Sequence, residues 1–495
     1  MVYALLSSIL LILSFPLFNL SFLAWVAFVP LFINARRSRK KNFLLFYLTG
    51  VIFWAGVLYW IVYVSLLGYI VLTLYLAVYF ALFGLGIYSP QENLKEEFLY
   101  ILFLSSLWVS LEFIRAHLFT GFPWALLGYS QYRNLLLIQT SDISGTYGVS
   151  FLLIAVNVGI SRFLLGLKRK KRVYLLSPIF ASLLLLATLV YGYQRLRYIS
   201  QLKPSRSVVV SVIQGNISPQ EKWDGEFKKR IIYRYLSLTK KALRRGEVDL
   251  VVWPETAVPC YFYQDKEAQG KILSLSSHIR SFLLIGTVVR EGEKIFNSAL
   301  FISKGRVIER YDKLHLVPFG EYVPSLFAFV RNFFEIGNFS AGKEWRIFSS
   351  SQINLLPPFS TLICFEDIFP YLSRGFVRKG ARFLINISND AWFGKSSAPY
   401  QHLQCAVFRA IENRVNLIKC SNTGISCFIA PTGRIVGTLS SAGKDIFIEG
   451  YYTQKIEIKK AGSFYTHFGD IFAFSCLLFC SGFGIIKFRV IKRGS

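Results

Sequence analysis

The sequence has few acidic residues, histidines and methionines. Its 495 residues include 28 Asp and Glu against 56 Lys and Arg, with 5 His and 1 Met. No two histidines have the spacing of a zinc site, and the 7 cysteines include no C-x-x-C pair. The sequence therefore indicates neither a zinc motif nor a dithiol redox motif. It also lacks low-complexity linkers and internal repeats.

The excess of basic residues gives a formal net charge of +28. Nucleic-acid binding is a poor explanation for this charge, because no recognition motif is present. Part of the charge lies in three clusters, "RRSRKK", "KRKKR" and "KFRVIKR", each of which follows an apolar run. More lies in residues 228–245, where apolar side chains at helical spacing predict an amphipathic helix with a basic face. We favour a solvated surface for that face, with attraction to anionic lipid headgroups as the alternative.

Long apolar runs dominate the two ends of the chain. Hydrophobic residues make up 53% of the sequence and mean hydropathy is +0.44, which is typical of a membrane protein. Runs of about 18 apolar residues can cross a bilayer as helices. We predict eight spans, at residues 3–19, 20–34, 43–63, 66–88, 98–116, 148–166, 173–194 and 468–486. The first two are short and share a turn near Pro16 and Asn19, so they could form a helical hairpin.

The basic clusters predict the orientation of these spans. With eight spans and a cytoplasmic N-terminus, all three clusters fall on the cytoplasmic side. Both termini are then cytoplasmic, and the long insert after span seven lies on the periplasmic side; a miscount of one span would reverse this. The N-terminus lacks the basic region and the A-x-A site of a cleaved signal peptide. We expect a multi-pass membrane protein whose insert lies in a periplasm-like space.

The insert has the pattern of a globular α/β domain. Buried strands are predicted at 207–217, 248–259 and 282–289, with helices between them, and an antiparallel pair is predicted around Lys304 and Gly305. Strands and helices alternate again after residue 359. We therefore predict a multi-span α-helical membrane bundle (eight helices) plus an αββα sandwich with mixed sheets. The predicted domains are residues 1–196, 207–465 and 466–495.

Three predicted strand ends carry residues that suit acyl-transfer chemistry. Glu255 stands in "WPET", Lys313 in "YDKLHL" and Cys364 in "LICFED". The carboxylate could take the thiol proton, the ammonium could stabilise the thiolate and an oxyanion, and the sulfur could hold an acyl group as a thioester. Taken singly, a cysteine at a strand end is more often a small core residue, and a lone lysine is more often at the surface.

The neighbouring acids complicate this assignment. Glu366 and Asp367 follow the cysteine within three residues and should raise its pKa, so the thiol needs the positive field of Lys313. Glu321 could pair with Lys313 or serve as a second acid.

The sequences of these and other segments resemble those of a known family. The motifs are "SFPLFNLSFLAWVAFVPLF", "LEFIRAHLFTGFPWALLGYSQ", "VIQGNISPQEKW", "WPETAVP", "YDKLHLVPFGEYVP", "ICFEDIFP", "NISNDAWFGKSSAPYQHLQCAVFRAIENR" and "NTGIS". In this order they resemble the apolipoprotein N-acyltransferases of the nitrilase (carbon–nitrogen hydrolase) superfamily. The resemblance covers nearly the whole chain and implies a nitrilase-like fold for the insert.

That resemblance implies an activity and a set of site residues. The family moves an acyl chain from a membrane phospholipid, through an enzyme thioester, to the N-terminal amine of a diacylglyceryl-cysteine lipoprotein. It implies no metal or organic cofactor, and we expect a monomer. The family's positions map to Glu255 as proton acceptor, Lys313, Cys364 as nucleophile, and Glu321, Glu366 and Trp223 in supporting roles. Some members carry Tyr where this chain has Phe365, so we expect Phe365 to shape the acyl pocket while its N–H serves the oxyanion.

Other residues have both functional and ordinary interpretations. Phe333 and Phe334 lie in an apolar stretch at 325–339, which is either a packed helix or a lid that dips into the bilayer and binds the acyl chain. Asn389 in "NISND" either positions the acyl carbonyl or makes an Asx-type turn. Glu112 and Arg115 in span five either order the bundle or contact headgroups.

Two histidines and two rival functions complete the predictions. His315 and His402 are weaker candidates for a Cys–His pair, and a supporting role suits His315. One rival function is a membrane-tethered amidase that gives the acyl group to water. The other is an assembly protein with an inactive domain, which the intact Glu255, Lys313 and Cys364 disfavour.

Overall fold

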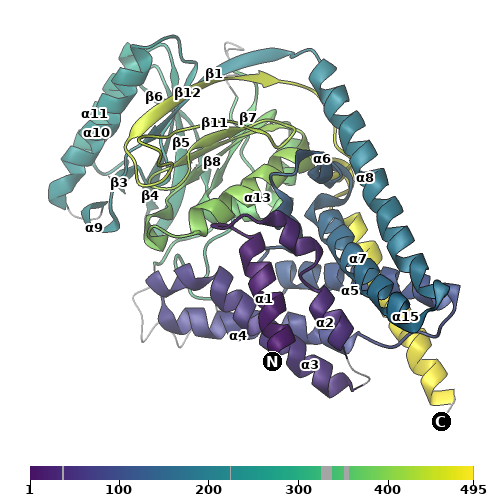
Figure 1. The fold of residues 1–495 in the computed structure, drawn as a ribbon. Coiled ribbons are helices and arrows are strands. Elements are labelled where there is room, and N and C mark those ends of the chain that lie inside the picture. The colour runs from purple at the N-terminus through teal and green to yellow at the C-terminus, as the bar shows by residue number, and fades with distance from the viewer. Residues whose placement is uncertain (36–37, 223–224, 325–336, 350–355, 494–495) are drawn as a thin grey trace. The chain divides into compact units, whose positions relative to one another are not determined.

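The chain forms two units (Figure 1), which we call the helical unit and the α/β unit. A computed structural model describes residues 1–35, 38–222, 225–324, 337–349 and 356–493. The helical unit comprises Met1–Ser200 and Ser463–Ser495, and the α/β unit comprises Gln201–Gly462.

The helical unit consists of helices of very different length. Four of its described helical segments are long and apolar enough to cross a membrane, at Leu66–Leu85, Leu94–His117, Ser141–Arg169 and Arg172–Gln201. Apolar helical segments of 10–17 residues lie at Val2–Ser14, Ser21–Asn34 and Ile471–Gly484. The count of eight spans stays a prediction. The helices are α1 (Val2–Ser14), α2 (Val29–Asn34), α3 (Arg39–Val57), α4 (Leu66–Leu85), α5 (Leu94–His117), α6 (Leu135–Ile138), α7 (Ser141–Arg169), α8 (Leu176–Gln201), α14 (Phe464–Phe468) and α15 (Ile471–Arg493).

The region predicted as the second span, residues 20–34, is not one continuous helix. A 3₁₀ helix at Ser21–Trp25 precedes α2, and the chain bends between them. Asn157 of α7 provides hydrogen-bond partners for the backbone at this bend. Its amide donates to the Ala24 carbonyl at 2.9 Å, and its oxygen accepts from the Phe28 N–H at 2.8 Å. Irregular backbone inside an apolar bundle requires such partners.

Buried charged side chains connect parts of the helical unit. Arg162 of α7 forms an ion pair with Glu97 of α5. Arg115 donates to the Phe122 carbonyl at 2.9 Å and to the Trp124 carbonyl at 2.8 Å, and Glu112 accepts from the Leu127 N–H at 2.7 Å. Both residues of the predicted Glu112/Arg115 site therefore bind the backbone that follows α5, which favours an ordering role for them.

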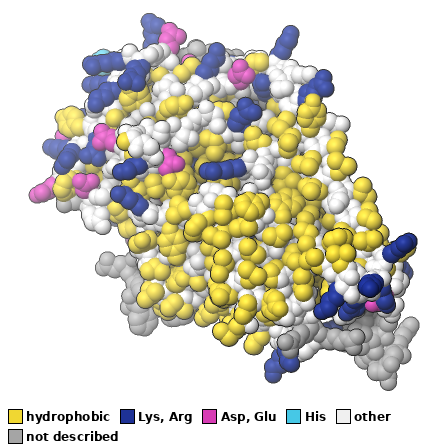
Figure 2. Space-filling view, in the orientation of Figure 1, with side chains coloured by type: hydrophobic (Ala, Val, Ile, Leu, Met, Phe, Trp, Pro, Cys, Tyr) yellow, Lys and Arg dark blue, Asp and Glu magenta, His cyan; other side chains and the backbone are white. Residues whose placement is uncertain are grey.

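The outer surface of the helical unit is apolar. Leu183 is 61% exposed, and Leu186 and Ile179 of the same helix α8 are 58% and 54% exposed. Hydrophobic side chains cover most of the visible face over the unit's helices, whereas Lys, Arg, Asp and Glu are frequent on the α/β unit (Figure 2). An exposed apolar surface of this extent suits contact with lipid.

Two mixed sheets form the centre of the α/β unit. The first has seven strands in the order β12-β1-β2-β4-β5-β6, with β3 paired to β4. Strands β1, β2 and β4 are parallel, and β12, β5 and β6 are antiparallel to their neighbours. The strands are β1 (Arg206–Gln214), β2 (Leu250–Val252), β3 (Val258–Tyr261), β4 (Phe282–Glu291), β5 (Lys294–Ser303), β6 (Arg306–Asp312) and β12 (Gly450–Ile458).

The second sheet has five strands in the order β11-β10-β9-β8-β7, of which β7, β8 and β9 are parallel. Helices α12 (Pro370–Arg378) and α13 (Ala398–Asn413) contact this sheet, and the two sheets contact each other through β1 and β9. The strands are β7 (Phe359–Ile363), β8 (Phe383–Ser388), β9 (Asn416–Ser421), β10 (Cys427–Ile429) and β11 (Ile435–Thr438).

Helices α10 (Gly225–Leu243) and α11 (Lys266–His278) pack on the first sheet, after the short α9 (Pro219–Lys222). The apolar face predicted for residues 227–242 is buried there, with Ile231, Tyr235 and Leu238 each at most 5% exposed. The unit is therefore the αββα sandwich that the sequence predicts. The predicted strand at 248–259 is divided into β2 and β3, because the chain turns at Pro254 and Glu255.

Candidate functional site

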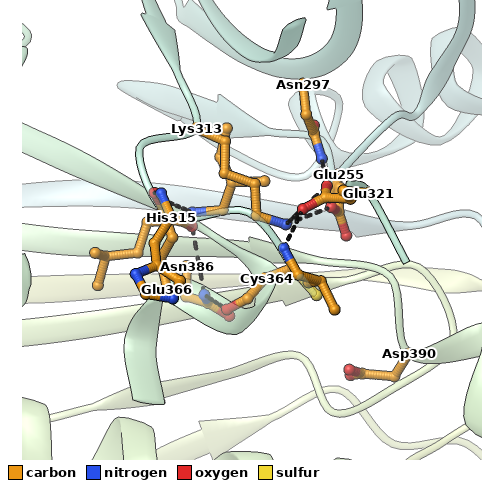
Figure 3. A network of polar contacts seen from close by, with 12 residues as sticks. Glu255, Asn297, Lys313, His315, Glu321, Cys364, Glu366, Asn386 and Asp390 are labelled. Carbon is orange, nitrogen blue, oxygen red and sulfur yellow. Dashed lines mark hydrogen bonds and ion pairs between the residues drawn. The ribbon is translucent and has the colours of Figure 1, made fainter. Parts of the chain in front are cut away.

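Glu255, Lys313 and Cys364 come together at strand ends of the α/β unit (Figure 3). Glu255 follows β2 by three residues, Lys313 follows β6 directly, and Cys364 follows β7 directly. Strands β2 and β6 run in the same direction in the first sheet, and β7 belongs to the second sheet. The site therefore uses strand ends from both sheets, where a rigid scaffold can present side chains. The three segments, distant in the sequence, form one polar cluster.

Lys313 lies between two carboxylates. Its Nζ is 3.6 Å from Glu255 Oε1 and 2.9 Å from Glu321 Oε2, and its side chain is 1% exposed. Burial alone would lower the pKa of Lys313, but the carboxylates of Glu321 and Glu255 outweigh burial and raise it. The lysine is therefore a fixed cation at the pH values where the protein works. Of the two roles predicted for Glu321, the structure shows the ion pair with Lys313.

Asn297, on strand β5, connects the two carboxylates. Its Nδ2 donates to Glu255 Oε1 at 2.7 Å and to Glu321 Oε1 at 2.9 Å. Its carbonyl accepts from the Lys313 N–H at 2.9 Å, so one residue holds the lysine backbone and both acids. Glu321 also accepts from the Val317 N–H at 2.8 Å, which anchors the loop after β6.

The thiol of Cys364 is protonated in this environment. Burial raises its pKa well above the usual value, the Glu255 carboxylate raises it further, and Lys313 lowers it. A protonated thiol is a weak nucleophile. The sulfur therefore needs a base at the moment it reacts, and Glu255 is the carboxylate with the largest effect on it.

The corner that carries Glu255 is fixed by a close backbone approach and by a second lysine. A Cβ added to Gly286 of β4 would lie 2.3 Å from the Pro254 carbonyl oxygen and 2.7 Å from the Glu255 Cα, so only glycine fits there. The buried Lys222 donates to the Glu255 carbonyl at 3.0 Å. Burial lowers the pKa of Lys222 to about 8. This lysine was not predicted.

Glu366 joins the lysine segment to the cysteine segment. It accepts hydrogen bonds from the Tyr311 hydroxyl at 2.8 Å, the Leu314 N–H at 2.7 Å and the Ile363 N–H at 2.7 Å. Burial raises the pKa of Glu366 to about 7, and the backbone donors oppose that shift. The sequence suggested a harmful charge beside the thiol, whereas the structure uses the carboxylate to anchor Lys313 against Cys364.

The remaining predicted residues have varied surroundings. Phe365 is half-buried, with its ring 5.3 Å from that of Phe369. Asn389 accepts from Asn422 at 2.9 Å, and its part in substrate binding stays a prediction. His315 contacts the Tyr371 hydroxyl at 2.8 Å. Trp223, Phe333 and Phe334 lie outside the described residues.

His402 approaches the backbone of the cysteine. Its Nε2 is 3.2 Å from the Cys364 carbonyl oxygen, on the same residue that the sequence proposed as its partner. Asp367, the second acid after the thiol, lies 2.6 Å from the same nitrogen. Among the described residues, no group of three or more His, Cys, Asp and Glu has the geometry of a metal site.

Sequence reasoning missed Asn297, Lys222 and the buried residues around His402. A signal was available: Asn297, Asn386 and Lys419 are polar residues inside otherwise apolar strands. Each is at most 3% exposed, and a buried polar side chain requires a specific partner.

Comparisons with known proteins identify the family of the chain. A family model described as apolipoprotein N-acyltransferase N-terminal domain matches residues 7–159, and one described as carbon-nitrogen hydrolase matches residues 209–453. An apolipoprotein N-acyltransferase of Geobacter metallireducens is 40% identical over 98% of this chain and 95% of its own length. The one from Pasteurella multocida is 32% identical over 98% and 95%.

Among solved structures, Nit3 of Saccharomyces cerevisiae is similar, with 21% identity, a TM-score of 0.40, and coverage of 54% of this chain and 96% of Nit3. The two sequence relatives extend over almost the full length of both chains. The chain therefore belongs to the apolipoprotein N-acyltransferase family and is an acyltransferase with a carbon–nitrogen hydrolase domain.

Proposed function

We propose that this enzyme moves an acyl chain from a membrane phospholipid to the N-terminal amine of a diacylated apolipoprotein, through a thioester on Cys364. The observation that supports it most is the cluster of one buried ammonium, two carboxylates and a protonated thiol. This cluster supplies a base, an electrostatic stabiliser and a nucleophile, which acyl transfer requires.

In the first half-reaction, Glu255 takes the Cys364 proton as the sulfur attacks the ester carbonyl. The oxyanion that forms is stabilised by the ammonium of Lys313 and by the N–H of Phe365. When the ester C–O bond breaks, Glu255 returns the proton to the leaving alkoxide, and a lysophospholipid leaves. The acyl group stays on sulfur.

In the second half-reaction, the lipoprotein amine attacks the thioester carbonyl. Glu255 takes a proton from the attacking nitrogen, and the C–S bond breaks. The proton then passes to the thiolate, so the free enzyme is restored. Lys313 keeps its charge throughout, because Glu321 and Glu255 hold its pKa above the usual value.

The supporting residues have proposed roles in the same cycle. Glu321 holds Lys313, and Glu366 holds the lysine segment against the cysteine segment. We assign Trp223, Phe333 and Phe334 to the path of the acyl chain, and Asn389 to the substrate.

The environment of the enzyme is also part of the proposal. An inner-membrane location with eight spans, both termini in the cytoplasm and the α/β unit on the periplasmic side would place the site near outer-leaflet phospholipid. The three basic clusters that follow apolar runs support this orientation. We expect the enzyme to work as a monomer.

The test is the intact mass of the purified full-length protein after incubation with phospholipid vesicles. We expect an acyl adduct that hydroxylamine removes and that the Cys364→Ala variant does not form. An adduct of equal amount in Cys364→Ala would overturn the thioester assignment.

A further inference from the structure

A cluster of buried polar residues lies behind Cys364, and the proposed reaction does not use it directly. It consists of Asp367, Asn386, Asp390, His402 and Lys419, none more than 2% exposed. These residues come from five elements: β8, β9, α13 and the two short helices that follow β7 and β8. Burying so many charged groups is costly unless they are fully paired.

The charges within this cluster balance. His402 Nε2 is 2.6 Å from Asp367 Oδ1, and His402 Nδ1 is 3.1 Å from Asp390 Oδ1. Lys419 Nζ is 3.4 Å from Asp367 Oδ2. Burial lowers the pKa of His402, but the carboxylates of Asp367 and Asp390 raise it to about 9. At neutral pH both ring nitrogens therefore carry a proton, and two cations face two anions.

Two members of the cluster approach one atom, the carbonyl oxygen of Cys364: the Asn386 amide donates to it, and the single N–H on His402 Nε2 is shared between it and Asp367. Asn386 Nδ2 lies 2.9 Å from this oxygen and His402 Nε2 lies 3.2 Å from it. The contact from Asn386 is visible in Figure 3. Lys419 Nζ donates to Asn386 Oδ1 at 2.6 Å, which fixes the orientation of the amide so that its NH₂ group faces the cysteine.

This carbonyl belongs to the peptide that joins Cys364 to Phe365. A trans peptide is planar, and its C=O and N–H point in opposite directions. Donors that fix the carbonyl from one side therefore fix the direction of the Phe365 N–H on the other side. They also polarise the peptide and strengthen its N–H as a donor.

We propose that Asn386 and His402, held by Asp367, Asp390 and Lys419, are positioning residues that aim the Phe365 N–H at the oxyanion. This inference rests on the proposed acyl transfer and names the residues that make its backbone donor effective. Neither side chain is assigned a contact with the substrate, so neither is a catalytic residue.

The backbone conformation of Cys364 shows why its carbonyl needs these hydrogen bonds. Its φ is +52°, in the left-handed region, which is a strained conformation for a non-glycine residue. Without the carbonyl bonds, the peptide is free to rotate toward an unstrained conformation.

The test separates the orientation of the Cys364–Phe365 peptide from the reactivity of the Cys364 thiol. Iodoacetamide reacts with sulfur by displacement at an sp³ carbon, and no oxyanion forms. Acyl loading from phospholipid vesicles passes through a tetrahedral oxyanion and needs the donors that stabilise it. Both rates are measured on the full-length protein, for the wild type and for Asn386→Leu, His402→Leu and His402→Gln.

We expect Asn386→Leu to lose acyl loading by on the order of 10–100-fold, because a misaligned donor forfeits much of the 10²–10³ that one such donor supplies. Alkylation of Cys364 should stay within about threefold of the wild type. His402→Gln keeps an N–H donor and should retain more loading than His402→Leu. The matched control is Cys405→Ala, a buried residue on the same helix α13, which should change neither rate.

Acyl loading within threefold of the wild type in Asn386→Leu and His402→Leu would overturn the inference. A parallel loss of loading and alkylation in these variants would also overturn it, because that result indicates a general structural role. Failure of the proposed function is distinct, because the wild type itself would then form no adduct with phospholipid.

Discussion

Replacing Lys313 with methionine removes the ammonium between Glu255 and Glu321 while keeping the volume of the side chain. The ammonium is 1% exposed, with carboxylate oxygens at 3.6 Å and 2.9 Å. After the replacement, the amide of Asn297 still bridges the two acids, but no described ammonium lies between them. Two carboxylates that share a buried site do not both stay ionised. One proton therefore binds at neutral pH, and Glu255 is compromised as a base.

The size of the effect follows from the geometry. At an effective dielectric constant of about 20, each contact of Lys313 is worth about 5 kcal/mol before desolvation. Removing one partner from a buried ion pair typically costs about 3–5 kcal/mol. Losing an oxyanion donor slows acyl transfer by about 10²–10³, and the loss of the base adds to this. We expect Lys313→Met to load acyl chains at least about 10³ more slowly than the wild type.

The assay is the rate of acyl-adduct formation from phospholipid vesicles, followed by intact mass. The control is Lys229→Met, whose ion pair with Glu267 at 3.2 Å lies at the surface. Exposed pairs are worth little, so this variant should match the wild type. Loading by Lys313→Met within tenfold of the wild type would refute the assigned role of the lysine.

Four further predictions concern residues around this centre and in the helical unit. Asn297→Leu removes the amide that bridges the two acids, so acyl loading should fall about tenfold or more; loading within about threefold of the wild type would contradict this. Burial raises the pKa of Glu366 to about 7, and the ionised carboxylate is the better acceptor for the backbone N–H groups. The rate of acyl loading in the wild type should therefore rise as pH increases through 7, and the Glu366→Gln variant should not show this rise. Arg115→Met leaves two buried backbone carbonyls without their donor, so melting in detergent should show a loss of about 2–4 kcal/mol; an unchanged melting temperature would argue against the ordering role. Burial lowers the pKa of His402 but Asp367 and a second carboxylate raise it to about 9, so its contribution to the free energy of unfolding is complete below pH 6.5 and is lost as pH rises through 9; His402→Gln should lack that slope in melting temperature.

The layers of the α/β unit could be predicted because its strands are short apolar runs that stop at polar residues. Strands β1 and β4 and helix α10 lie where apolar periodicity places them. The same rule located Glu255, Lys313 and Cys364, because each follows a strand. The division at 248–259 was less visible, because the run stays apolar on both sides of Pro254 and Glu255.

The neighbours of these residues could not be predicted, because sequence does not give the register between distant strands. Asn297 lies beside Lys313 only because β5 and β6 pair with Ser298 opposite Asp312. From the sequence, the acids after Cys364 are expected to disfavour its thiolate form and raise its pKa. In three dimensions Glu366 binds backbone N–H groups, so its charge serves the scaffold.

The helical unit shows a similar limit. Hydropathy located its apolar segments, and four of them are helices long enough to span a bilayer. It could not show the bend within residues 20–34, because that bend depends on Asn157, more than a hundred residues later in the chain. A single polar side chain determines the backbone conformation there, and a hydropathy average over many residues does not detect one such side chain.

The most direct test of the account is a chase of the isolated acyl-enzyme. Wild-type protein is loaded with a labelled acyl chain from phospholipid, separated from the donor, and mixed with a diacylated lipopeptide that has a free N-terminal amine. The account predicts that the label leaves Cys364 and appears as an amide on that amine. Release of the label as free fatty acid, with the lipopeptide unchanged, would contradict it and would favour a membrane-tethered amidase.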